Sequence, residues 1–459
     1  MADTGSLLAA AVGPEHVLTG DHVPAEYGHD ESLTVPARAP EYVVRPTTAA
    51  EVSAVLRVAA AERIPVTARG SGTGMSGACV PRAEGIVVSF ERMDRILEID
   101  TANHVAVVQP GVTLADLDRR TAEVGLCYPV RSGERSATVG GTIATNAGGM
   151  YAVRHGVTRH HVLGVEAVLA SGETVRSGGR YVKTSTGYDL TQLLVGSEGT
   201  LALITEAVLR LTPRAGHGAT VLAPFTAPED IARAVPRLLA GGLDPLALEY
   251  VDMLTMAALT ADHEFGLGIP EQVRDTALGY LVVVLEEHST DRLEADVEAA
   301  GEQLLSLGAA DVYVLPPAAA RRLIHAREHA FWTAKAAGAD EVVDIVVPRA
   351  ALPALLAEAD AIARDSGSVI TGCGHAGDGN VHLAVFQPDR DRRDAVLRRL
   401  FRAGTALGGA ISGEHGVGRA KKPYFLDLED PAKIRLMRRL KHAFDPDGIL
   451  NPDVLLGQA

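Results

Sequence analysis

The chain is 459 residues long, which is more than one hydrophobic core usually holds, so two domains are expected. Hydrophobic residues make up 47% of the sequence and charged residues 22%, and the formal net charge is −15. A surface with this much negative charge repels phosphate backbones and anionic lipids, which argues against nucleic-acid and membrane partners. A small anionic substrate is still allowed, because a few cations or a metal ion reverse the sign inside one pocket.

The cysteines argue against a thiolate metal centre. Cys79, Cys127 and Cys373 are scattered, and without a Cys-x-x-Cys spacing neither a zinc–thiolate site nor an iron–sulfur cluster is supported. The odd number suits a reducing compartment. The first residues carry an early Asp and too short an apolar stretch for a signal peptide, and no apolar run approaches the roughly 20 residues of a membrane span. The chain is therefore predicted to be cytoplasmic.

The first half of the chain is predicted to contain capped helices between short strands. Thr48-Ala-Ala-Glu51 is a capping box that opens an amphipathic helix running to about Glu62. A second capping box, Thr113-Leu-Ala-Asp116, starts another helix, and a Ser171-Gly172 turn predicts a hairpin. Strands are expected over Pro65–Ala68, Ile86–Ser89, Ile96–Ile99, Val105–Val108, Val165–Leu169, Glu173–Arg176 and Leu201–Leu211, and a linker over Pro213–Gly218.

The second half alternates strands with longer helical patterns. This alternation predicts an α+β or α/β layer with helices on one face of a sheet. A last helix is expected from Pro431 to about Ala443, where Asp445-Pro-Asp-Gly448 stops it. The other elements expected here are strands Leu281–Leu285, Val312–Leu315 and Val342–Val347, and helices Asp291–Leu307 and Leu352–Arg364.

A glycine-rich loop, Arg69-Gly-Ser-Gly-Thr-Gly-Met-Ser-Gly77, follows a predicted strand and contains Gly-x-Gly-x-x-Gly. Glu91 even lies near the spacing at which a Rossmann acid binds ribose. A Rossmann loop must open a helix, however, and only eight residues separate Gly77 from the strand at Ile86. We therefore prefer a backbone nest that holds a pyrophosphate, with a flexible turn as the other alternative.

Two further stretches have side chains small enough for the backbone to approach a ligand. They are Thr138-Val-Gly-Gly-Thr-Ile-Ala-Thr-Asn-Ala-Gly-Gly149 and Gly196-Ser-Glu-Gly-Thr200. Any one such stretch could be structural. Joined by Gln109-Pro-Gly111, the three describe a long groove lined by backbone amides, which suits a dinucleotide.

These segments resemble the FAD-binding domain of the vanillyl-alcohol oxidase/p-cresol methylhydroxylase (VAO/PCMH) superfamily. Within it they resemble the branch of glycolate oxidase subunits, D-lactate dehydrogenases and D-2-hydroxyglutarate dehydrogenases, and the likeness runs from about Pro46 to Pro452. The resemblance implies an α+β fold: a PCMH-type FAD-binding domain of two α/β subdomains at residues 38–215, then a FAD-linked oxidase C-terminal α+β domain at 216–456. The second domain should have an antiparallel sheet covered by helices, and residues 411–456 should pack back on the flavin domain.

The resemblance also implies the cofactor. Members that attach flavin covalently often use a His of the first loop, and none lies between Arg69 and Gly77, so non-covalent FAD is expected. Asn451 belongs to a closing motif that usually continues Gly-Lys and here continues Asp453-Val454. The residues expected to bind FAD are Arg69, Gly70, Ser71, Gly72, Thr73, Gly74, Met75, Ser76, Pro110, Gly111, Thr138, Gly140, Gly141, Ala144, Thr145, Asn146, Gly148, Glu198, Gly199, Ile204 and Asn451.

A histidine motif, Gly374-His-Ala-Gly-Asp-Gly-Asn-Val-His382, predicts a metal site. If Gly377-Asp-Gly379 forms a hairpin turn, His375 lies directly opposite His382, with both side chains on one face. About thirty residues later, Ser412-Gly-Glu-His-Gly-Val-Gly418 supplies Glu414 and His415. Two His and one carboxylate with an open position suit Zn²⁺ or a similar divalent ion, whereas a lone His would more often only complete a buried polar network.

The resemblance gives these residues roles in a reaction. His375, His382 and Glu414 match metal ligands of the family, His415 matches its catalytic base, and Arg327 matches an Arg that fixes the substrate carboxylate. The function implied is oxidation of a small D-2-hydroxy acid, lactate- or glycolate-like, to the 2-oxo acid. It proceeds by metal-assisted deprotonation of the hydroxyl and hydride transfer to flavin N5.

Some residues depart from the hydroxyglutarate pattern. Relatives that act on D-2-hydroxyglutarate commonly carry a Lys shortly before the segment that starts at Asp344, where this chain has Val342-Val343, and an Asn where it has Ala384. A second substrate carboxylate then lacks an obvious partner unless Lys335 supplies one, so lactate, glycolate or a longer apolar 2-hydroxy acid is favoured. D-2-hydroxyglutarate dehydrogenase is the first alternative. A catalytically silent FAD-binding subunit, a metallohydrolase and a nicotinamide dehydrogenase follow.

The sequence leaves the electron acceptor and the assembly undecided. Without cysteine clusters there is no built-in iron–sulfur relay, so quinone, cytochrome, electron-transfer flavoprotein and O₂ are all left open. A homodimer is likewise left open as the assembly state.

Overall fold

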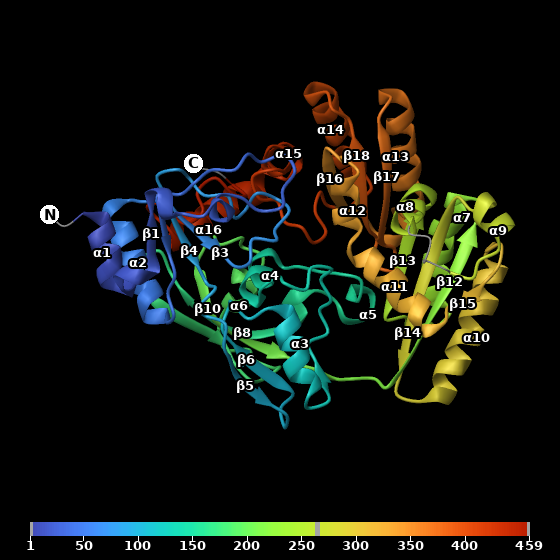
Figure 1. Ribbon diagram of the computed structural model, residues 1–459, viewed down its shortest axis with the longest axis horizontal. Helices are drawn as coiled ribbons and strands as arrows, with labels where there is room; N and C mark the ends of the chain where they lie inside the picture. Colours follow the sequence, from blue (N-terminus) through green and yellow to red (C-terminus); the bar gives the residue numbers. More distant parts are fainter. Residues whose placement is uncertain (1–2, 262–266, 457–459) are drawn as a thin grey trace.

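The computed structural model describes residues 3–261 and 267–456, which are built around three main β-sheets (Figure 1). The first sheet has the order β1-β2-β4-β3 and forms one core with α1 (Thr4–Val12) and α2 (Ala49–Glu62). Helix α2 begins as predicted, because the Thr48 hydroxyl accepts from the Glu51 amide. The strands are β1 (Val17–Thr19), β2 (Tyr42–Val44), β3 (Val66–Arg69) and β4 (Ile86–Ser89).

The glycine loop leaves the carboxyl end of β3, which pairs in parallel with β4. No helix forms between this loop and β4, all of whose residues are described, so the exclusion of a Rossmann unit is confirmed. The chain instead crosses to β4 in turns and bends.

The second sheet has the order β5-β6-β10-β8-β9 and is antiparallel throughout. Its core includes side chains from α3 and α4, and the predicted cap of α3 is confirmed, because the Thr113 hydroxyl accepts from the Asp116 amide. The strands are β5 (Ile96–Asp100), β6 (Val105–Val108), β8 (Val162–Val168), β9 (Thr174–Gly178) and β10 (Leu203–Arg210). The helices are α3 (Leu114–Ala122), α4 (Val139–Thr145), α5 (Ala152–His155) and α6 (Leu190–Leu194), and β7 (Leu126–Cys127) pairs with β11 (Thr212–Pro213).

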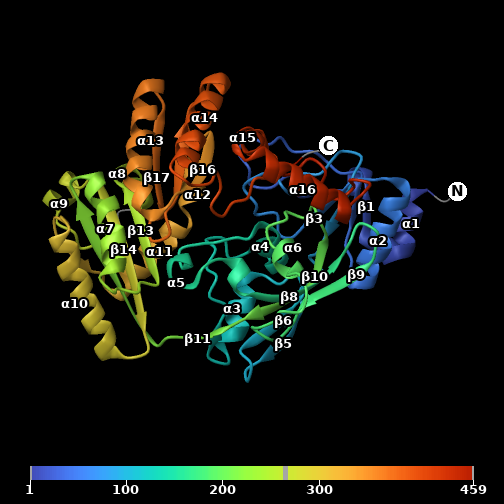
Figure 2. The same ribbon diagram turned by 180° about the vertical axis from the view of Figure 1, so that it is seen from behind.

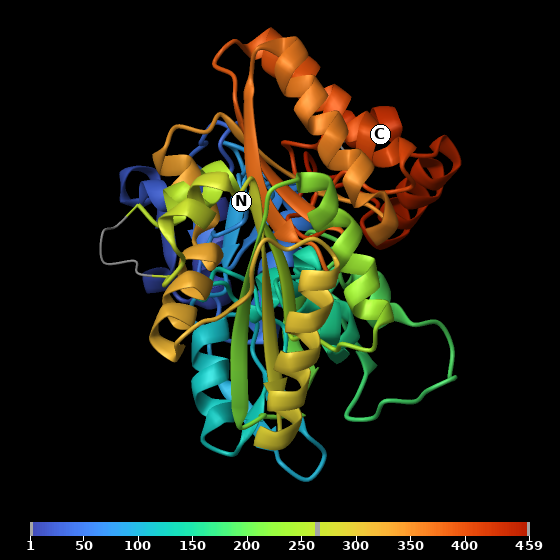
Figure 3. The ribbon, with the colours of Figure 1, turned by 90° about the vertical axis from the view of Figure 1, so that its right-hand side faces the viewer.

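The third sheet is antiparallel, with the order β15-β12-β14-β13-β17-β18-β16. Its strands are β12 (His217–Phe225), β13 (Ala247–Asp252), β14 (Gly279–Glu287), β15 (Tyr313–Val314), β16 (Glu341–Val346), β17 (Val369–His375) and β18 (Asn380–Phe386). Long helices cover one face, as the helix α10 against the green strands illustrates (Figure 3). They are α7 (Pro228–Ala240), α10 (Thr290–Ser306), α13 (Leu352–Ser366) and α14 (Arg390–Ala406).

The expectation of helices on one face of this sheet is incomplete. Short helices pack on the opposite face, because neighbouring strand residues such as Val221 and Leu222 point to opposite sides and both are fully buried. These helices are α8 (Met253–Leu259) and α11 (Pro317–Glu328), followed by α12 (Ala330–Ala336), while α9 (Glu271–Thr276) lies between β13 and β14 in the sequence.

The predicted register of the histidine hairpin is wrong by two residues. His375 pairs with Asn380, and His382 pairs with Cys373. The turn is tighter than predicted, because the amide of Gly379, at a φ of 88°, already donates to the His375 carbonyl at 3.1 Å. A shift of two preserves the face on which a side chain points, so His375 and His382 still lie on one side, with ring centroids 5.1 Å apart.

The end of the chain returns to the first sheet (Figures 1 and 2). Helices α15 (Lys422–Leu428) and α16 (Pro431–Phe444) precede a bridge in which Leu450 pairs in parallel with Val66. Lys441 on α16 also donates to the Thr200 carbonyl at 2.8 Å. A division into domains at residue 215 stays a prediction. Among the described residues, no helix combines the length and apolar character that crossing a bilayer requires.

Candidate active site

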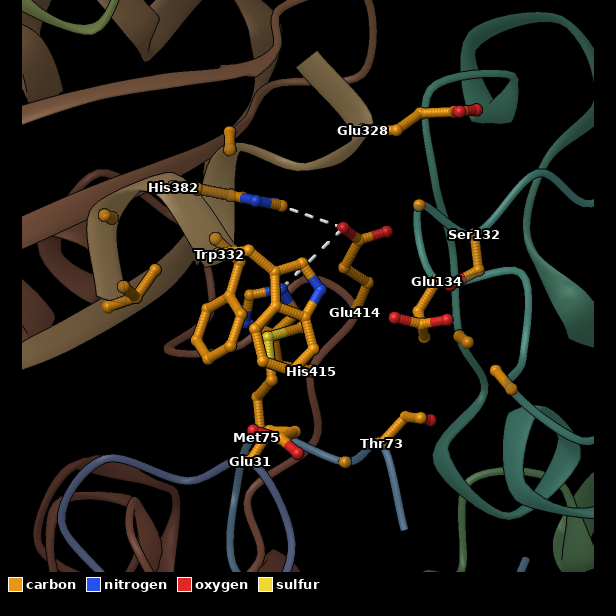
Figure 4. Close-up of a pocket in the computed structure, with 18 of the residues that line it drawn as sticks. Glu31, Thr73, Met75, Ser132, Glu134, Glu328, Trp332, His382, Glu414 and His415 are labelled. Carbon is orange, nitrogen blue, oxygen red and sulfur yellow. Dashed lines mark ion pairs between the residues drawn. The ribbon is translucent and has the colours of Figure 1, made fainter. Parts of the chain in front are cut away.

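A cavity lies between the glycine loop and the third sheet, and its empty volume, open solvent included, is about 1790 Å³ (Figure 4). Its walls come from the loop after β3, from α4, and from helices α8, α11 and α12. Strands β16, β17 and β18 of the third sheet and the loop that carries Glu414 and His415 complete the walls. Segments from both halves of the sequence therefore share one space.

The glycine loop needs its glycines because other groups approach its backbone closely. A Cβ on Gly72, which has a φ of 77°, would overlap the guanidinium of Arg69. That guanidinium is buried and donates to the His29 carbonyl at 2.7 Å. Gly70 likewise faces the hydroxyl of Thr138, the N-cap of α4. The glycine loop therefore packs closely against α4, and its backbone faces the cavity.

Many of the residues expected to bind FAD line the cavity, and the others do not line it. Those on the wall are Gly70, Ser71, Gly72, Thr73, Gly74, Met75, Ser76, Thr138, Gly141, Thr145 and Gly148. Those outside it are Arg69, Pro110, Gly111, Gly140, Ala144, Asn146, Glu198, Gly199, Ile204 and Asn451.

Glu198 and Asn451, which do not line the cavity, connect C-terminal segments to the first half of the chain. The buried Glu198 carboxylate accepts from the amides of Val417 and Gly418 at 2.9 and 2.7 Å, and burial raises its pKa. Asn451 donates to the carbonyls of Ala78 and Glu198 at 3.0 and 2.9 Å. Both side chains tie the C-terminal segments to the flavin side, and a direct role at the cofactor stays a prediction.

The residues on the wall fit a dinucleotide. Small side chains and glycine backbone line the loop of residues 70–76 and the start of α4, so amide groups can approach a pyrophosphate. Met75 and Trp332 lie on the same cavity, where Figure 4 places both near His415. Apolar groups of this kind can contact the flat ring system of a flavin.

The histidine hairpin and the Glu414 loop form one cluster. Glu414 Oε1 lies 3.2 Å from His375 Nε2 and 3.1 Å from His382 Nε2. Four-coordinate Zn²⁺, with bonds of about 2.1 Å, holds its ligand atoms roughly 3.4 Å apart, so these separations fit an ion bound among the three. In Figure 4, Glu414 reaches from its loop toward His382, and the His415 ring lies 4.7 Å from the His382 ring.

Glu249 on β13 orients both His375 and Arg327. Its side chain is fully buried, and its two oxygens lie 2.8 and 3.0 Å from His375 Nδ1. Burial alone would lower the pKa of His375, but the carboxylates of Glu249 and Glu414 raise it well above its usual range. A carboxylate on Nδ1 leaves Nε2 facing Glu414 and the place of an ion, an arrangement common around metal-binding histidines.

Arg327 is buried at the end of α11, whereas an Arg on a helix is usually solvated. Its Nη2 lies 2.8 Å from Glu249 Oε2, and its side chain is only 6% exposed. Its Nε has no hydrogen-bond partner among the described residues, although Arg327 lines the cavity. The guanidinium therefore has donors left for an anion.

Asp344 on β16 shapes the loop of Glu414 and His415. Its fully buried carboxylate accepts from the amides of Glu414 and His415 at 3.0 and 2.8 Å, and from the Ser412 hydroxyl at 2.8 Å. Burial lowers the pKa of His415 to about 4, although Asp344 opposes this. His415 is thus neutral near pH 7 and able to accept a proton.

Sequence reasoning missed Glu249 and the structural role of Asp344. The signal for Glu249 is an acid in the middle of the apolar strand Ala247-Leu-Glu-Tyr-Val251, since a buried acid needs partners. Asp344 stands in a similar strand, Val342-Val-Asp-Ile-Val346. Trp332 and Arg131 also line the cavity without having been singled out.

Fold and site together define a flavin-binding oxidoreductase with a glycine-lined cradle facing a His–His–Glu cluster. Residues 40–178 match the family described as "FAD binding domain", and residues 214–455 match "FAD linked oxidases, C-terminal domain". The chain belongs to the FAD-linked oxidases of the VAO/PCMH superfamily and is an FAD-linked oxidoreductase.

Known relatives cover the chain almost completely. A Mycobacterium tuberculosis protein described as an uncharacterized FAD-linked oxidoreductase is 54% identical over 457 residues, which is 100% of both chains. A D-lactate dehydrogenase of Anaerostipes hadrus is 36% identical, covering 96% of this chain and 94% of the relative. The solved structure of p-cresol methylhydroxylase with substrate bound has a TM-score of 0.81 at 17% identity, covering 99% and 96% of the two chains, and this likeness concerns the fold.

Proposed function

We propose that the protein oxidises a small D-2-hydroxy acid to the 2-oxo acid with non-covalently bound FAD and a divalent metal ion, Zn²⁺ being favoured. The observation that carries this proposal is the shared cavity, on which the glycine loop, the His375–His382–Glu414 cluster, His415 and Arg327 all open. The D configuration is inferred from the D-lactate dehydrogenase relative.

Different residues of the chain position the substrate, accept its proton and bind the dinucleotide. Arg327, with donors not used by Glu249, binds the substrate carboxylate. Neutral His415 takes the proton of the 2-hydroxyl, and its loop is held by Asp344. The glycine loop of residues 70–76 binds the dinucleotide through its backbone.

The bound groups supply the rest of the chemistry. A divalent ion, which His375, His382 and Glu414 would hold, would lower the cost of removing the hydroxyl proton, and bound FAD would supply the acceptor for the hydride from C2. Two electrons and two protons thus leave the alcohol carbon and its oxygen, as the 2-oxo product requires.

The cavity favours a substrate whose 2-substituent is uncharged. Among the described residues, Lys335 pairs with Glu31 at 2.6 Å and lies over the Trp332 ring rather than on the cavity wall. Arg131 on the wall is paired with Glu328 at 2.6 Å. A second carboxylate, as in 2-hydroxyglutarate, would have to displace one of these pairs.

Apolar side chains stand where the departures from the hydroxyglutarate pattern occur. Val342 and Ala384 pack with Phe331 and Phe386 in one cluster, and all four line the cavity. This lining suits the methyl group of lactate or a longer apolar chain, and these four side chains offer no charge to the second carboxylate of D-2-hydroxyglutarate.

Anaerobic bleaching of the flavin tests the proposal. We expect the purified yellow protein to bleach with D-lactate or a longer D-2-hydroxy acid, more slowly with the L-enantiomers, and poorly with D-2-hydroxyglutarate. A yellow protein inert to every hydroxy acid would instead be a catalytically silent subunit. A colourless protein that retains its metal would be a metallohydrolase, and either result refutes the proposal.

A further inference from the structure

A second pocket, separate from the active-site cavity, carries a surplus of positive charge. It is formed by segments that are distant in the sequence, before β2, before β4 and at the C-terminal return. Its charged lining residues are Arg38, Arg82, Arg419, Lys422, Glu84 and Asp453. Four cations against two carboxylates leave two positive charges in excess, on a chain whose net charge is −15.

The carboxylate of Asp453 does not neutralise this cluster. Arg82 uses both Asp453 oxygens, donating from Nε and Nη2 at 3.0 and 2.9 Å. Within residues 3–261 and 267–456, Lys422 donates only to the Asp453 backbone carbonyl, at 2.7 Å. Arg38 is exposed and forms no ion pair among the described residues. Arg38 and Lys422 therefore keep donors for another anion.

Arg419 is the cation of the cluster that most needs an anionic partner. Its side chain is only 10% exposed, yet its single ion pair, from Nη1 to Asp453, is long at 3.4 Å. Its Nε and Nη2 are buried with no hydrogen-bond partner in the described parts of the chain. Burial, together with repulsion from Arg38 and Arg82, lowers the pKa of Arg419. A buried guanidinium with two unsatisfied donors is costly unless an anion accepts from it.

We propose that this pocket is a binding site for a phosphate-type oxyanion, either free phosphate or the phosphoryl group of a small metabolite. Arg419 lines the pocket, and its guanidinium carries an unpaired planar edge of the kind with which Arg binds phosphate by two parallel hydrogen bonds. Arg38, from the segment before β2, and Lys422, three residues after Arg419, add donors from which the remaining oxygens of a tetrahedral anion can accept. The net charge of −15 on the whole chain disfavours a large polyanion such as RNA.

The pocket lies directly behind the active-site loop. The amides of Arg419 and Ala420 both donate to the carbonyl of Ser76, at 2.9 and 3.0 Å, and Ser76 lines the active-site cavity. An anion bound to Arg419 would therefore stabilise the segment that supports the glycine loop. This role is independent of which 2-hydroxy acid the enzyme oxidises.

Calorimetric titration of the flavin-loaded protein with inorganic phosphate, at constant ionic strength set by chloride, tests the site. We expect one saturable site in the wild type, and binding at least tenfold weaker in Arg38→Gln and in Arg419→Gln. Arg38 is exposed, so its variant should fold normally even if Arg419→Gln is destabilised. Arg120→Gln is the matched control, because Arg120 is an exposed Arg that pairs only with Glu123.

The outcomes separate a specific site from general charge attraction. Unchanged affinity in Arg38→Gln, or no saturable binding in the wild type, would overturn the proposal, as would chloride competing as well as phosphate. Glycerol 3-phosphate in the same titration identifies the source. Binding as tight as that of phosphate supports a phosphorylated metabolite, and much weaker binding supports free phosphate.

Discussion

Replacing Glu249 by Gln should weaken metal binding without removing a ligand. Glu249 is fully buried and contacts His375 Nδ1 at 2.8 Å, so the substitution keeps the shape of the contact and removes its charge. A hydrogen bond to a charged group contributes about 1.5–3 kcal/mol. If the metal depends on this orientation, affinity should fall roughly 10- to 100-fold, the range seen for partners that orient metal ligands.

The assay is competition for the ion with a coloured chelator, with flavin absorbance recorded to check that the cofactor site is intact. Asp252→Asn is the matched control. Asp252 ends the same strand β13 and accepts from Thr371 and Gly372, but it forms no hydrogen bond or ion pair with His375 or Arg327 in the described parts of the chain. If Glu249→Gln retains metal as tightly as Asp252→Asn does, the orienting role of Glu249 is refuted.

Three further predictions follow from the same site and its surroundings. His415→Asn should slow flavin reduction by D-lactate roughly 10²–10⁴-fold in stopped-flow measurements while leaving the flavin spectrum unchanged, and near-normal reduction would reject His415 as the base. Removal of metal by a chelator should abolish flavin reduction but not flavin absorbance, and added Zn²⁺ should restore the rate; unaffected reduction would exclude a metal-dependent reaction. Burial lowers the pKa of His155 to about 4, from 6.5 in an unfolded chain, so the unfolded state binds the proton first and stability should fall as pH drops from 6.5 toward 4. His155→Gln should lessen this fall in urea midpoints measured at pH 7 and pH 5, and an unchanged pH dependence would contradict the assignment.

Much of the local structure could be predicted because its signals are local. The caps at Thr48 and Thr113 mark helix starts through hydrogen bonds within four residues, and both helices begin there. The same local reasoning excluded a Rossmann helix after the glycine loop. Strand β4 begins and ends at the predicted residues for the same reason, as a short apolar run between turn residues.

The hairpin register could not be predicted with the same certainty. Gly377 and Gly379 both permit a turn, and only the three-dimensional path decides which residue first pairs. The face of His375 and His382 was still predicted correctly, since it depends only on whether the shift is even. The two histidines were therefore placed on one face from an incorrect register.

The orienting residues could not be predicted because their signal is non-local. Glu249 is separated from His375 by more than a hundred residues and meets it only through the pairing of β13 with β17. Asp344 contacts the His415 loop through β16, which lies at the edge of the sheet. Contacts of this kind follow from sheet order, which a single sequence does not encode locally.

The loop at residues 412–418 is held at both ends by buried carboxylates from different halves of the protein, Asp344 at its start and Glu198 at its end. An ion on Glu414 would fix the first part of this loop, and a dinucleotide in the cradle would steady the turn before β10 that presents Glu198. Each occupant thus lowers the entropy that the other must lose on binding. By thermodynamic reciprocity, metal and flavin should raise each other's affinity by the same factor.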